Sequence, residues 1–572
     1  MGEPVMHLHP AIRRILKRRG IKASNDIAEF LSEKPIRTYD PFLLRNMREG
    51  VDFILSAINE NKRICVYGDY DVDGIAATAL LVRALRYITD NVDWYIPSRF
   101  SEGYGLNKEA LRNIADSGAR AVITVDCGSV SSEEVAFGKS LGLDLLVTDH
   151  HNIDGRAADC LIINPKQEGD PYPFRDLAGC GVAFKLAQAL RQTLSLPKDM
   201  LNDALDLVGL ATIADIVPLV DENRTFAKYG LKALNRMRRP GLRSLVEKLG
   251  FAGKMISADK VAFIIAPHIN AAGRMGEARD VVELLLTDDK AVINRVTDEL
   301  IAYNNERKSV QEDVFENCDK IAARMIKRGA PICVVNAGDA HEGITGIVAG
   351  KLKEKYSRPV IILTNSASAQ DSAYLKGTGR SVESVDMYEL LKNHEDMFEK
   401  FGGHAMACGF LMKAVDEERF RDTLIRDMYV LLSRSPDILD VPVPEPDAEI
   451  RPKDVNADFA RRLRALEPFG SGNPMPVLAV RNLIVSDLAR IGQGRILRFN
   501  AGSLPCVLFR RADEFYDTLA SGNPVSVFGC PTIETYKGKQ RMQFKVEWVL
   551  EATAQPGDFD RNCTNEGFAC SL

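Results

Sequence analysis

The chain has 572 residues, of which 45% are hydrophobic and 27% are charged. At about 100–200 residues per domain, this length predicts three or four domains, each able to bury its own core. The ordinary apolar content excludes the fibrous and disordered classes, and no stretch reaches the ~20 apolar residues that a bilayer requires. The net charge of −5 gives no overall sign of nucleic-acid binding, although a basic face can still exist locally.

The first residues lack a cationic segment followed by an apolar run, so we expect no secretory signal. The eleven cysteines are scattered along the chain and form no C-x-x-C pair. Most of them lie in apolar segments, where cysteine behaves as a small hydrophobe. These features predict a reduced, cytoplasmic protein that does not contact a membrane.

Residues 1–60 form an N-terminal helical segment with a basic cluster at 13–19, which fits a solvated helix face and a nucleic-acid contact equally well. Between 61 and 285, short β-rich runs alternate with amphipathic helices, and from 177 onward the period is almost only helical. Alternating strands and helices predict an α/β domain with a parallel sheet. A long polar connecting helix is expected at 286–325.

A second α/β domain is expected at 326–435, where apolar strands again alternate with helices. Prolines then mark a linker at 436–465. The last domain is expected at 466–552, where residues 476–552 alternate with period two between turn signals, a pattern that predicts an all-β barrel or sandwich. The polar tail at 553–572 is expected to be disordered, and we find no internal repeat.

Acidic side chains follow the ends of the predicted strands. Asp69, Asp71 and Asp73 stand in GDYDVDG after one strand, and Asp126 follows another. Such neighbouring carboxylates repel one another unless a cation lies between them. The pattern also resembles a calcium-binding loop, but that loop needs a glutamate where this chain has Leu80. A surface turn is the alternative for one such motif, and its recurrence at several strand ends favours a metal site.

A third strand ends in Asp149, His150 and His151, and Asp215 lies within an apolar run. Carboxyl ends of parallel strands meet at one edge of a sheet, where α/β proteins bind ligands. Neighbouring histidines point in different directions, so we expect one to bind metal and the other to reach the substrate. Asp149 is a candidate to orient an imidazole.

Aspartate oxygens with one imidazole favour Mn²⁺ or Mg²⁺ over a thiolate zinc site. Four acids and a histidine suit two ions that share ligands, the arrangement used for phosphoryl displacement. The residues therefore predict hydrolysis of phosphodiesters or phosphoanhydrides.

These motifs resemble the DHH phosphoesterase superfamily and, within it, the RecJ family of bacterial single-strand-specific exonucleases. GDYDVDG, VDCG, TDHH and LATIADIVPL stand in the family's order, followed by PHINAAGR, NNERK, HEGITGIVAG, GTGRS, GGHAMACGF and LEPFGSGNPMPVL. The resemblance covers residues 8–550. It implies a DHH domain, a DHH-associated domain joined by a long helix, and an oligonucleotide-binding (OB) barrel.

The resemblance also implies roles for individual residues. The implied metal ligands are Asp71, Asp73, Asp126, His150 and Asp215, with His151 facing the scissile phosphate beside Asp149. The implied substrate contacts are Asp69, Arg99, Asn270, Arg274, Thr378, Arg380, Ser381 and His404. GTGRS resembles a pocket for the 5′-phosphate, with Arg99 as a second cationic arm.

The β-rich region is expected to bind the strand. It holds ten Lys/Arg against six Asp/Glu between 481 and 550. Tyr536 and Phe544 offer either stacking faces or ordinary core. The sequence IETYKGK departs from the family where an Asn is expected before the tyrosine, so the contacts of this loop are left open.

The activity expected from the resemblance is 5′→3′ exonuclease action on single-stranded DNA in recombination and repair. A helicase and a single-strand-binding protein are candidate partners. Two alternatives remain: a DHH oligoribonuclease or nucleotide phosphatase, for which a strand-binding barrel has no use, and an inactive scaffold, against which the intact acids and histidines argue.

Overall fold

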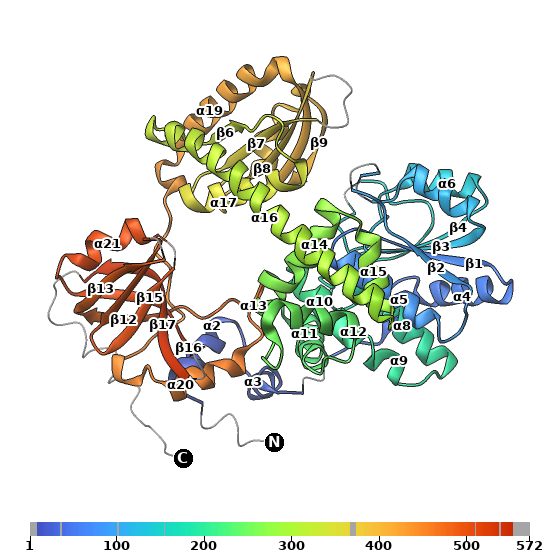
Figure 1. Ribbon diagram of the computed structural model, residues 1–572, viewed down its shortest axis with the longest axis horizontal. Helices are drawn as coiled ribbons and strands as arrows, with labels where there is room; N and C mark the ends of the chain where they lie inside the picture. Colours follow the sequence, from blue (N-terminus) through green and yellow to red (C-terminus); the bar gives the residue numbers. More distant parts are fainter. Residues whose placement is uncertain are drawn as a thin grey trace. The chain divides into compact units, whose positions relative to one another are not determined.

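The computed structural model describes residues 8–34, 37–99, 102–103, 105–153, 155–366, 373–492, 494–509, 511–536 and 539–552. It divides into two compact units (Figure 1). One comprises Lys34–Val441 and Pro468–Asn473, and the other comprises Met1–Glu33, Pro442–Glu467 and Pro474–Leu572. The tail predicted to be disordered, 553–572, lies outside the described residues.

The larger unit begins with a five-stranded sheet in the order β2-β1-β3-β4-β5. Every neighbouring pair is parallel, as predicted. The strands are β1 (Arg63–Gly68), β2 (Val92–Tyr95), β3 (Ala119–Val125), β4 (Asp144–Thr148) and β5 (Leu161–Ile163). Apolar side chains cover both faces of the sheet: Ile64 and Val66 face one core, and Cys65 and Tyr67 face the other.

Helices fill both cores. The first core takes α4 (Met47–Asn59), α5 (Val72–Leu85) and α8 (Gly179–Leu194), and the second takes α6 (Lys108–Asp116) and α7 (Ser132–Ser140). Because β1 lies between β2 and β3, the chain changes direction across the sheet there. Open α/β sheets bind ligands at such switch points, beyond the carboxyl ends of the strands.

A helical layer follows the sheet, with α10 (Leu205–Ala214), α11 (Asp221–Leu234) and α14 (Ala266–Met275). The shorter helices of this layer are α9 (Asp199–Asn202), α12 (Pro240–Val246), η2 (Glu247–Phe251), α13 (Ala258–Lys260), η3 (Val261–Ile265) and α15 (Ala278–Leu286). The long connecting helix is α16 (Lys290–Lys327), four residues later at its start than predicted. The reason is a cap: the Asp289 carboxylate accepts the amide protons of Ala291 and Val292 at 2.7 and 3.4 Å.

The second α/β domain has a mixed sheet in the order β6-β7-β8-β10-β9. Its strands are β6 (Cys333–Asn336), β7 (Val360–Asn365), β8 (Tyr374–Arg380), β9 (Phe398–His404) and β10 (Ala407–Lys413). Only β6 and β7 pair in parallel. Its helices are α17 (Glu342–Tyr356), α18 (Met387–Lys392) and α19 (Glu417–Arg434), and the sequence patterns did not reveal α19.

The smaller unit is built on a seven-stranded sheet in the order β11-β12-β16-β17-β15-β14-β13. Its strands are β11 (Ala448–Glu449), β12 (Leu478–Leu483), β13 (Val485–Ile491), β14 (Ile496–Ala501), β15 (Leu504–Leu508), β16 (Val525–Tyr536) and β17 (Lys539–Glu551). The predicted β-region also contains a helix, α21 (Ala512–Ala520). The predicted linker 436–465 is folded rather than free chain. Its strand β11 pairs with β12, and it contains a helix, α20 (Ala457–Leu463), that belongs to the smaller unit.

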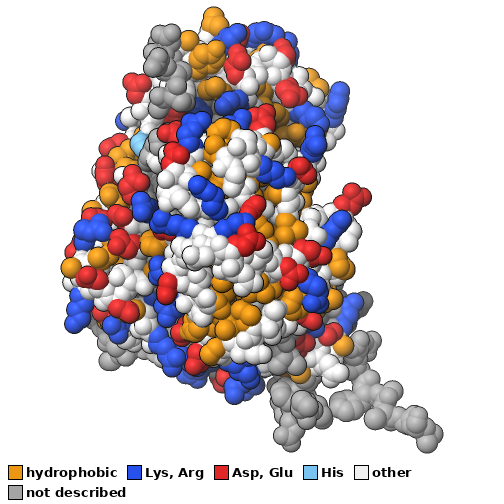
Figure 2. Space-filling view, turned by 90° about the vertical axis from the view of Figure 1, so that its right-hand side faces the viewer, with side chains coloured by type: hydrophobic (Ala, Val, Ile, Leu, Met, Phe, Trp, Pro, Cys, Tyr) orange, Lys and Arg blue, Asp and Glu red, His pale blue; other side chains and the backbone are white. Residues whose placement is uncertain are grey.

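The N-terminal helical segment is divided between the units. Helices α2 (Pro10–Arg18) and α3 (Ser24–Leu31) belong to the smaller unit, whereas α4 packs in the core of the parallel sheet. The Arg18 guanidinium of the basic cluster is bound to Glu445 at 2.8 Å. Figure 2 shows basic and acidic side chains interspersed over one face of the molecule. No helix of the described residues is long and apolar enough to cross a bilayer.

Helices α10 and α11 pack with their backbones in contact. A methyl group added at Gly209 on α10 would overlap the backbone of Gly230 on α11, and the reverse also holds. Only glycine permits this approach. The contact matters for the site below because Asp215 directly follows α10 as its C-cap.

We predict that Gly209→Ala lowers the free energy of unfolding by about 1–3 kcal/mol, because the two helices must separate. Urea unfolding measures this change. The matched control is Gly350→Ala on α17, where an added methyl group meets nothing within 4 Å. That substitution should be neutral or stabilising, since alanine favours a helix. Equal effects of the two substitutions would contradict the packing argument.

Candidate functional site

Five aspartates and two histidines converge beyond the carboxyl ends of β1, β3 and β4. Their ligand atoms form three groups whose members lie within 4.8 Å of one another. The groups are Asp73, His150 and Asp215; Asp69, Asp71 and Asp126; and Asp126, His150 and His151. The structure thus brings together the five residues predicted to bind metal. It also places Asp69, predicted to contact substrate, beside Asp71 and Asp126.

The backbone holds the acids in place from two sides. Asp73 accepts the amide protons of Gly179 and Cys180 at 2.7 and 2.8 Å, at the N-terminus of α8, where the helix dipole favours negative charge. Asp71 caps α5 by accepting the amides of Asp73 and Gly74. A Cβ atom at Gly179 would collide with the Asp126 carboxylate, so glycine lets α8 approach the acids this closely.

Asp126 itself has a left-handed backbone, with φ of 64°. Non-glycine residues adopt this conformation rarely, and it costs about 1–3 kcal/mol where the surroundings enforce it. The conformation turns the carboxylate from the end of β3 toward His150, whose Nε2 lies 3.0 Å from Asp126 Oδ1. Strained backbone of this kind is typical of functional sites.

The protein alone does not balance the negative charge of these carboxylates. Burial and the charge of Asp71 raise the pKa of Asp69 to about 7 and that of Asp215 to about 7. Burial, followed by the charge of neighbouring aspartates, raises the pKa of Asp73 and Asp126 well above the ordinary range. Asp69 Oδ1, Asp126 Oδ1 and His150 Nε2 are buried and accept or donate no hydrogen bond among the described residues.

This donor set fits divalent cations. Buried polar atoms normally have partners, and three orphaned ligand atoms in one acidic cluster leave a place for positive charge. Carboxylate oxygens with one imidazole are the ligands that Mg²⁺ and Mn²⁺ prefer. Burial and the charge of His151 lower the pKa of His150 to about 3, so its imidazole is neutral, as a metal ligand must be.

The two histidines have different environments, as predicted. The imidazole Nδ1 of His151 lies 2.8 Å from Asp149 Oδ1, and the side chain is 47% exposed. Although burial opposes it, the hydrogen bond that the imidazole donates to Asp149 raises the pKa of His151. Burial alone would raise the pKa of Asp149, but its hydrogen bonds with His151 and the Ser129 amide outweigh that effect and lower it.

Asp149 belongs to none of the three ligand groups. Its carboxylate also accepts the backbone amides of His150 and His151, and Asn164 donates to the His151 carbonyl at 3.0 Å. With Nδ1 of His151 facing the carboxylate, Nε2 faces away from it. Asp149 therefore lies where it can orient the His151 imidazole, the role for which the sequence made it a candidate.

A cationic pocket lies where the two α/β domains meet. It is lined by Tyr70, Arg99 and Arg274 from the first domain and by Thr378 and Arg380 from β8. Arg274 donates to the carbonyl oxygen of Gly343 at the start of α17, at 2.9 Å. Burial and the charges of Arg99 and Arg307 lower the pKa of Arg274 to about 10. Like charges held this close predict an anion as the ligand.

Other predicted substrate contacts lie differently. Asn270 accepts the Val72 amide at 3.1 Å, next to the metal ligands. Ser381 is buried and its hydroxyl donates to the Val385 carbonyl at 2.6 Å. His404 is exposed at the end of β9, paired with Ala407. Neither Ser381 nor His404 is among the described residues that line the pocket.

The sequence analysis missed several contributors. Tyr70 lines the pocket, with the Arg99 guanidinium 5.2 Å from its ring centre. His341 also lines it and caps α17 through a bond from the Gly343 amide. The motif HEGITGIVAG, which begins at His341 and leads into α17, could have indicated that His341 lies at the site. The amides of α8 left no signal, because a backbone donor has no sequence pattern.

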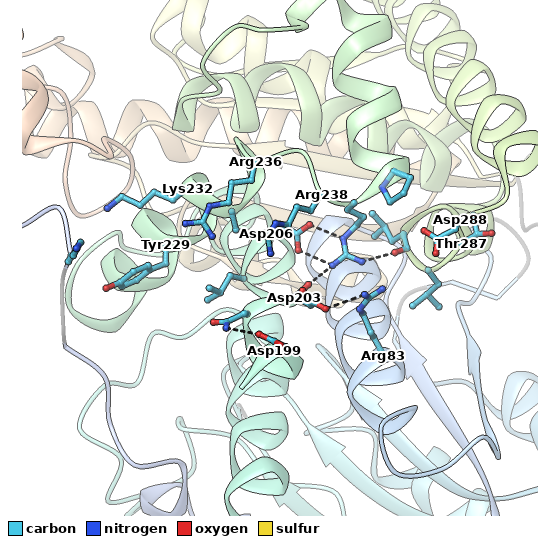
Figure 3. Close-up of a pocket in the computed structure, with 18 residues that line it drawn as sticks. Arg83, Asp199, Asp203, Asp206, Tyr229, Lys232, Arg236, Arg238, Thr287 and Asp288 are labelled. Carbon is cyan, nitrogen blue, oxygen red and sulfur yellow. Dashed lines mark hydrogen bonds and ion pairs between the residues drawn. The ribbon is translucent and has the colours of Figure 1, made fainter. Parts of the chain in front are cut away.

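A second pocket lies elsewhere in the helical layer (Figure 3). Arg239 spans it, donating to both oxygens of Asp206 at 2.8 and 2.9 Å and to the Leu285 carbonyl. Arg83 lies 3.4 Å from Asp203. None of the predicted site residues lines this pocket, so we do not assign the site to it.

Comparisons with known proteins agree with this geometry. Residues 63–212 match the DHH family N-terminal domain, residues 329–428 the DHHA1 domain and residues 446–548 the RecJ OB domain. The chain is 34% identical to the single-stranded-DNA-specific exonuclease RecJ of Bacillus subtilis over 95% of this chain and 69% of that protein. The chain belongs to the RecJ family.

RecJ of Haemophilus influenzae is 32% identical over 95% of this chain and 96% of that protein. Among solved structures, RecJ of Thermus thermophilus in complex with Mn²⁺ matches with a TM-score of 0.79 and 28% identity, covering 97% of this chain and 78% of that one. The RecJ resemblance inferred from the motifs is thereby confirmed, as is the order of DHH, DHH-associated and OB domains.

We predict that Asp126→Asn raises the melting temperature of the metal-free protein at pH 8. The folded-state pKa of Asp126 lies above its unfolded value, so ionised Asp126 destabilises the fold at high pH, and this cost disappears as pH falls. Asparagine removes the charge and tolerates the left-handed backbone. In a unit of this size the expected rise is about 1 °C for ~1 kcal/mol.

In the same thermal scans, Mn²⁺ should stabilise the wild type and stabilise Asp126→Asn much less. Asp116→Asn, at an exposed site on α6, is the control and should change neither result. A metal-free protein destabilised by Asp126→Asn would contradict the repulsion argument.

Proposed function

We propose that this chain is a 5′→3′ exonuclease that acts on single-stranded DNA and releases mononucleotides. The proposal depends chiefly on one observation: an uncompensated acidic cluster and a cationic pocket are neighbours in one compact unit, since Tyr70, which lines the pocket, stands between Asp69 and Asp71 of the cluster. A cation site suits phosphodiester hydrolysis, and a separate anion pocket suits the end of a strand. Family membership supports a role in recombination and repair.

Two ions of Mn²⁺ or Mg²⁺ would be held by two of the three groups. Asp73, His150 and Asp215 would bind one, and Asp69, Asp71 and Asp126 the other. When bound, such a pair supplies an activated water and stabilises the charge that develops on phosphate oxygens. Compared with the ligand set expected from the motifs, this assignment adds Asp69.

His151 would act on the scissile phosphate. Asp149 holds its Nδ1, so Nε2 is the nitrogen that would donate to a phosphate oxygen or to the leaving oxygen. The hydrogen bond that Nδ1 donates to Asp149 raises the pKa of His151, which favours the doubly protonated imidazole that can donate from Nε2. This is the arrangement of a general acid oriented by a carboxylate.

The pocket of Arg99, Arg274 and Arg380 would hold the terminal 5′-phosphate. Guanidinium groups recognise phosphate through paired hydrogen bonds, and a terminal phosphate carries more charge than an internal one. Thr378 lies on the same face of β8 as Arg380, with its hydroxyl 3.2 Å from that of Thr345. Docking of the end in this pocket would set which linkage reaches the acidic cluster.

The smaller unit would supply strand affinity. Arg498 on β14 pairs with Val507 on β15, which pairs with Lys545 on β17, so the two cations share one row across three strands. OB folds hold single strands with such cations and aromatic platforms. Phe544, one of the two candidate platforms, is fully buried and belongs to the core instead. The side chain of Tyr536 and residue Lys537 lie outside the described residues.

We also propose a cytoplasmic location, supported by nine described cysteines that form no disulfide with one another. A helicase and a single-strand-binding protein are proposed as partners, because a strand must be unwound before an enzyme of this specificity can digest it. The strand-binding unit argues against a dinucleotide phosphatase, and the intact ligand groups argue against a scaffold.

The direct test compares labelled single-stranded DNA, duplex DNA and a short RNA, each with Mn²⁺ and with a chelator. We expect mononucleotides from the single strand only, and only with metal. Asp126→Asn should retain strand binding and lose at least about a hundredfold in turnover, more than the loss of a supporting residue causes. Digestion without divalent cation, or equal digestion of duplex, would refute the proposal.

A second prediction concerns polarity. Arg380→Ala should reduce the preference for a 5′-phosphorylated over a 5′-hydroxyl strand about tenfold, the lower limit for a charged hydrogen bond to phosphate. Competition between the two strands measures this ratio. Arg419→Ala, an exposed arginine of α19, is the control. If the variant discriminates the ends as well as the wild type, the pocket is misassigned.

A further inference from the structure

The helix that carries Asn270 and Arg274 has an accessible face that extends away from the site. The turn η3 (Val261–Ile265) runs directly into α14, which carries Asn270 and Arg274. Val261, Ile265, Ile269 and Ala272 are buried against the core. Phe263, Pro267, Asn270 and Arg274 are accessible and recur every three or four residues, so they form one stripe. At 1.5 Å per residue the stripe is about 16 Å long.

Phe263 ends this stripe, and 77% of its surface is exposed. It lies on a π-turn, a rare helix form that is frequent at functional sites. A single exposed apolar residue needs no explanation, but Phe263 is not isolated. Lys260 lies three residues earlier on the same helical run, and its amino group donates to the carbonyl oxygen of Met255 at 2.7 Å.

Met255 is itself 75% exposed. The amino groups of Lys254 and Lys260 lie 5.5 and 5.1 Å from the ring centre of Phe251. We call Phe251, Lys254, Met255, Lys260 and Phe263 the aromatic–basic patch. Asp259 is exposed beside it, so the patch retains a net positive charge. Cations beside exposed rings are the features with which proteins bind single strands without reading sequence.

We propose that the aromatic–basic patch is a stacking platform for bases of the substrate strand, with Phe263 as its central ring. The strand would run from the 5′-phosphate pocket past Arg274 and Asn270 and along the stripe to Phe263. The helix that contacts the reacting end thus also supports the strand a few nucleotides downstream. This inference rests on the proposed exonuclease function.

The test uses the full chain, a chelator to stop cleavage, and 5′-phosphorylated strands of about 16 nucleotides, enough to fill an OB fold as well. Each strand carries one 2-aminopurine, whose fluorescence is quenched by stacking, at successive positions from the 5′ end. We expect quenching at a position a few nucleotides from the end. Phe263→Leu should abolish it at that position alone and raise Kd about five- to tenfold, the lower range for one stacked base.

Phe263→Trp should restore both the quenching and the affinity, because it restores a stacking face. Val415→Ala, at a site 84% exposed on the DHH-associated domain, is the control and should change neither. Unchanged quenching in Phe263→Leu would overturn the inference, and so would quenching lost at every position. A change of oligomeric state with normal strand binding would likewise overturn it and identify a protein contact. Failure of the exonuclease function would instead show in the wild type, as absence of metal-dependent digestion.

Discussion

The repulsion among buried carboxylates at the end of a parallel sheet is the constraint on which the rest of the structure depends. Asp69, Asp73 and Asp126 are almost fully buried, and without a counter-charge their ionised forms oppose folding. The fold holds them together through the α8 amides and the strained backbone of Asp126. A protein that maintains such repulsion at this cost has a site that requires added positive charge.

The site thus has two regions of opposite charge. Acids and a neutral imidazole form one region, which suits cations, and Arg99, Arg274 and Arg380 line the other, which suits an anion. The hydrogen bond from Arg274 to Gly343 joins the two α/β domains at this point. A phosphate chain fits such a surface, because one phosphate can occupy the arginines while the next linkage faces the acids. The spacing between them, set by α14 and α17, would determine how much of the strand is released.

Much of this arrangement could be predicted from the sequence. The alternation of β-rich runs with amphipathic helices predicted the parallel sheet, and the convergence of the aspartates followed from their places after its strands. The different environments of His150 and His151 were also expected, because neighbouring side chains point in different directions. What could not be predicted depends on tertiary structure: the amide donors of α8, the position of Asp69 among the ligands, and the engagement of Ser381 with Val385. Helix α21 was missed because a short amphipathic segment between strands has weak periodicity. Helix α19 was missed although its 18 residues are long enough to show a helical period.

Counting the metal ions bound per chain tests the central claim most directly. Equilibrium dialysis against Mn²⁺ should give two ions for the wild type. Asp215→Asn should lose one ion and Asp71→Asn the other, because these residues belong to different ligand groups. A wild type that binds no Mn²⁺, or two variants that both retain two ions, would contradict the account of the acidic cluster.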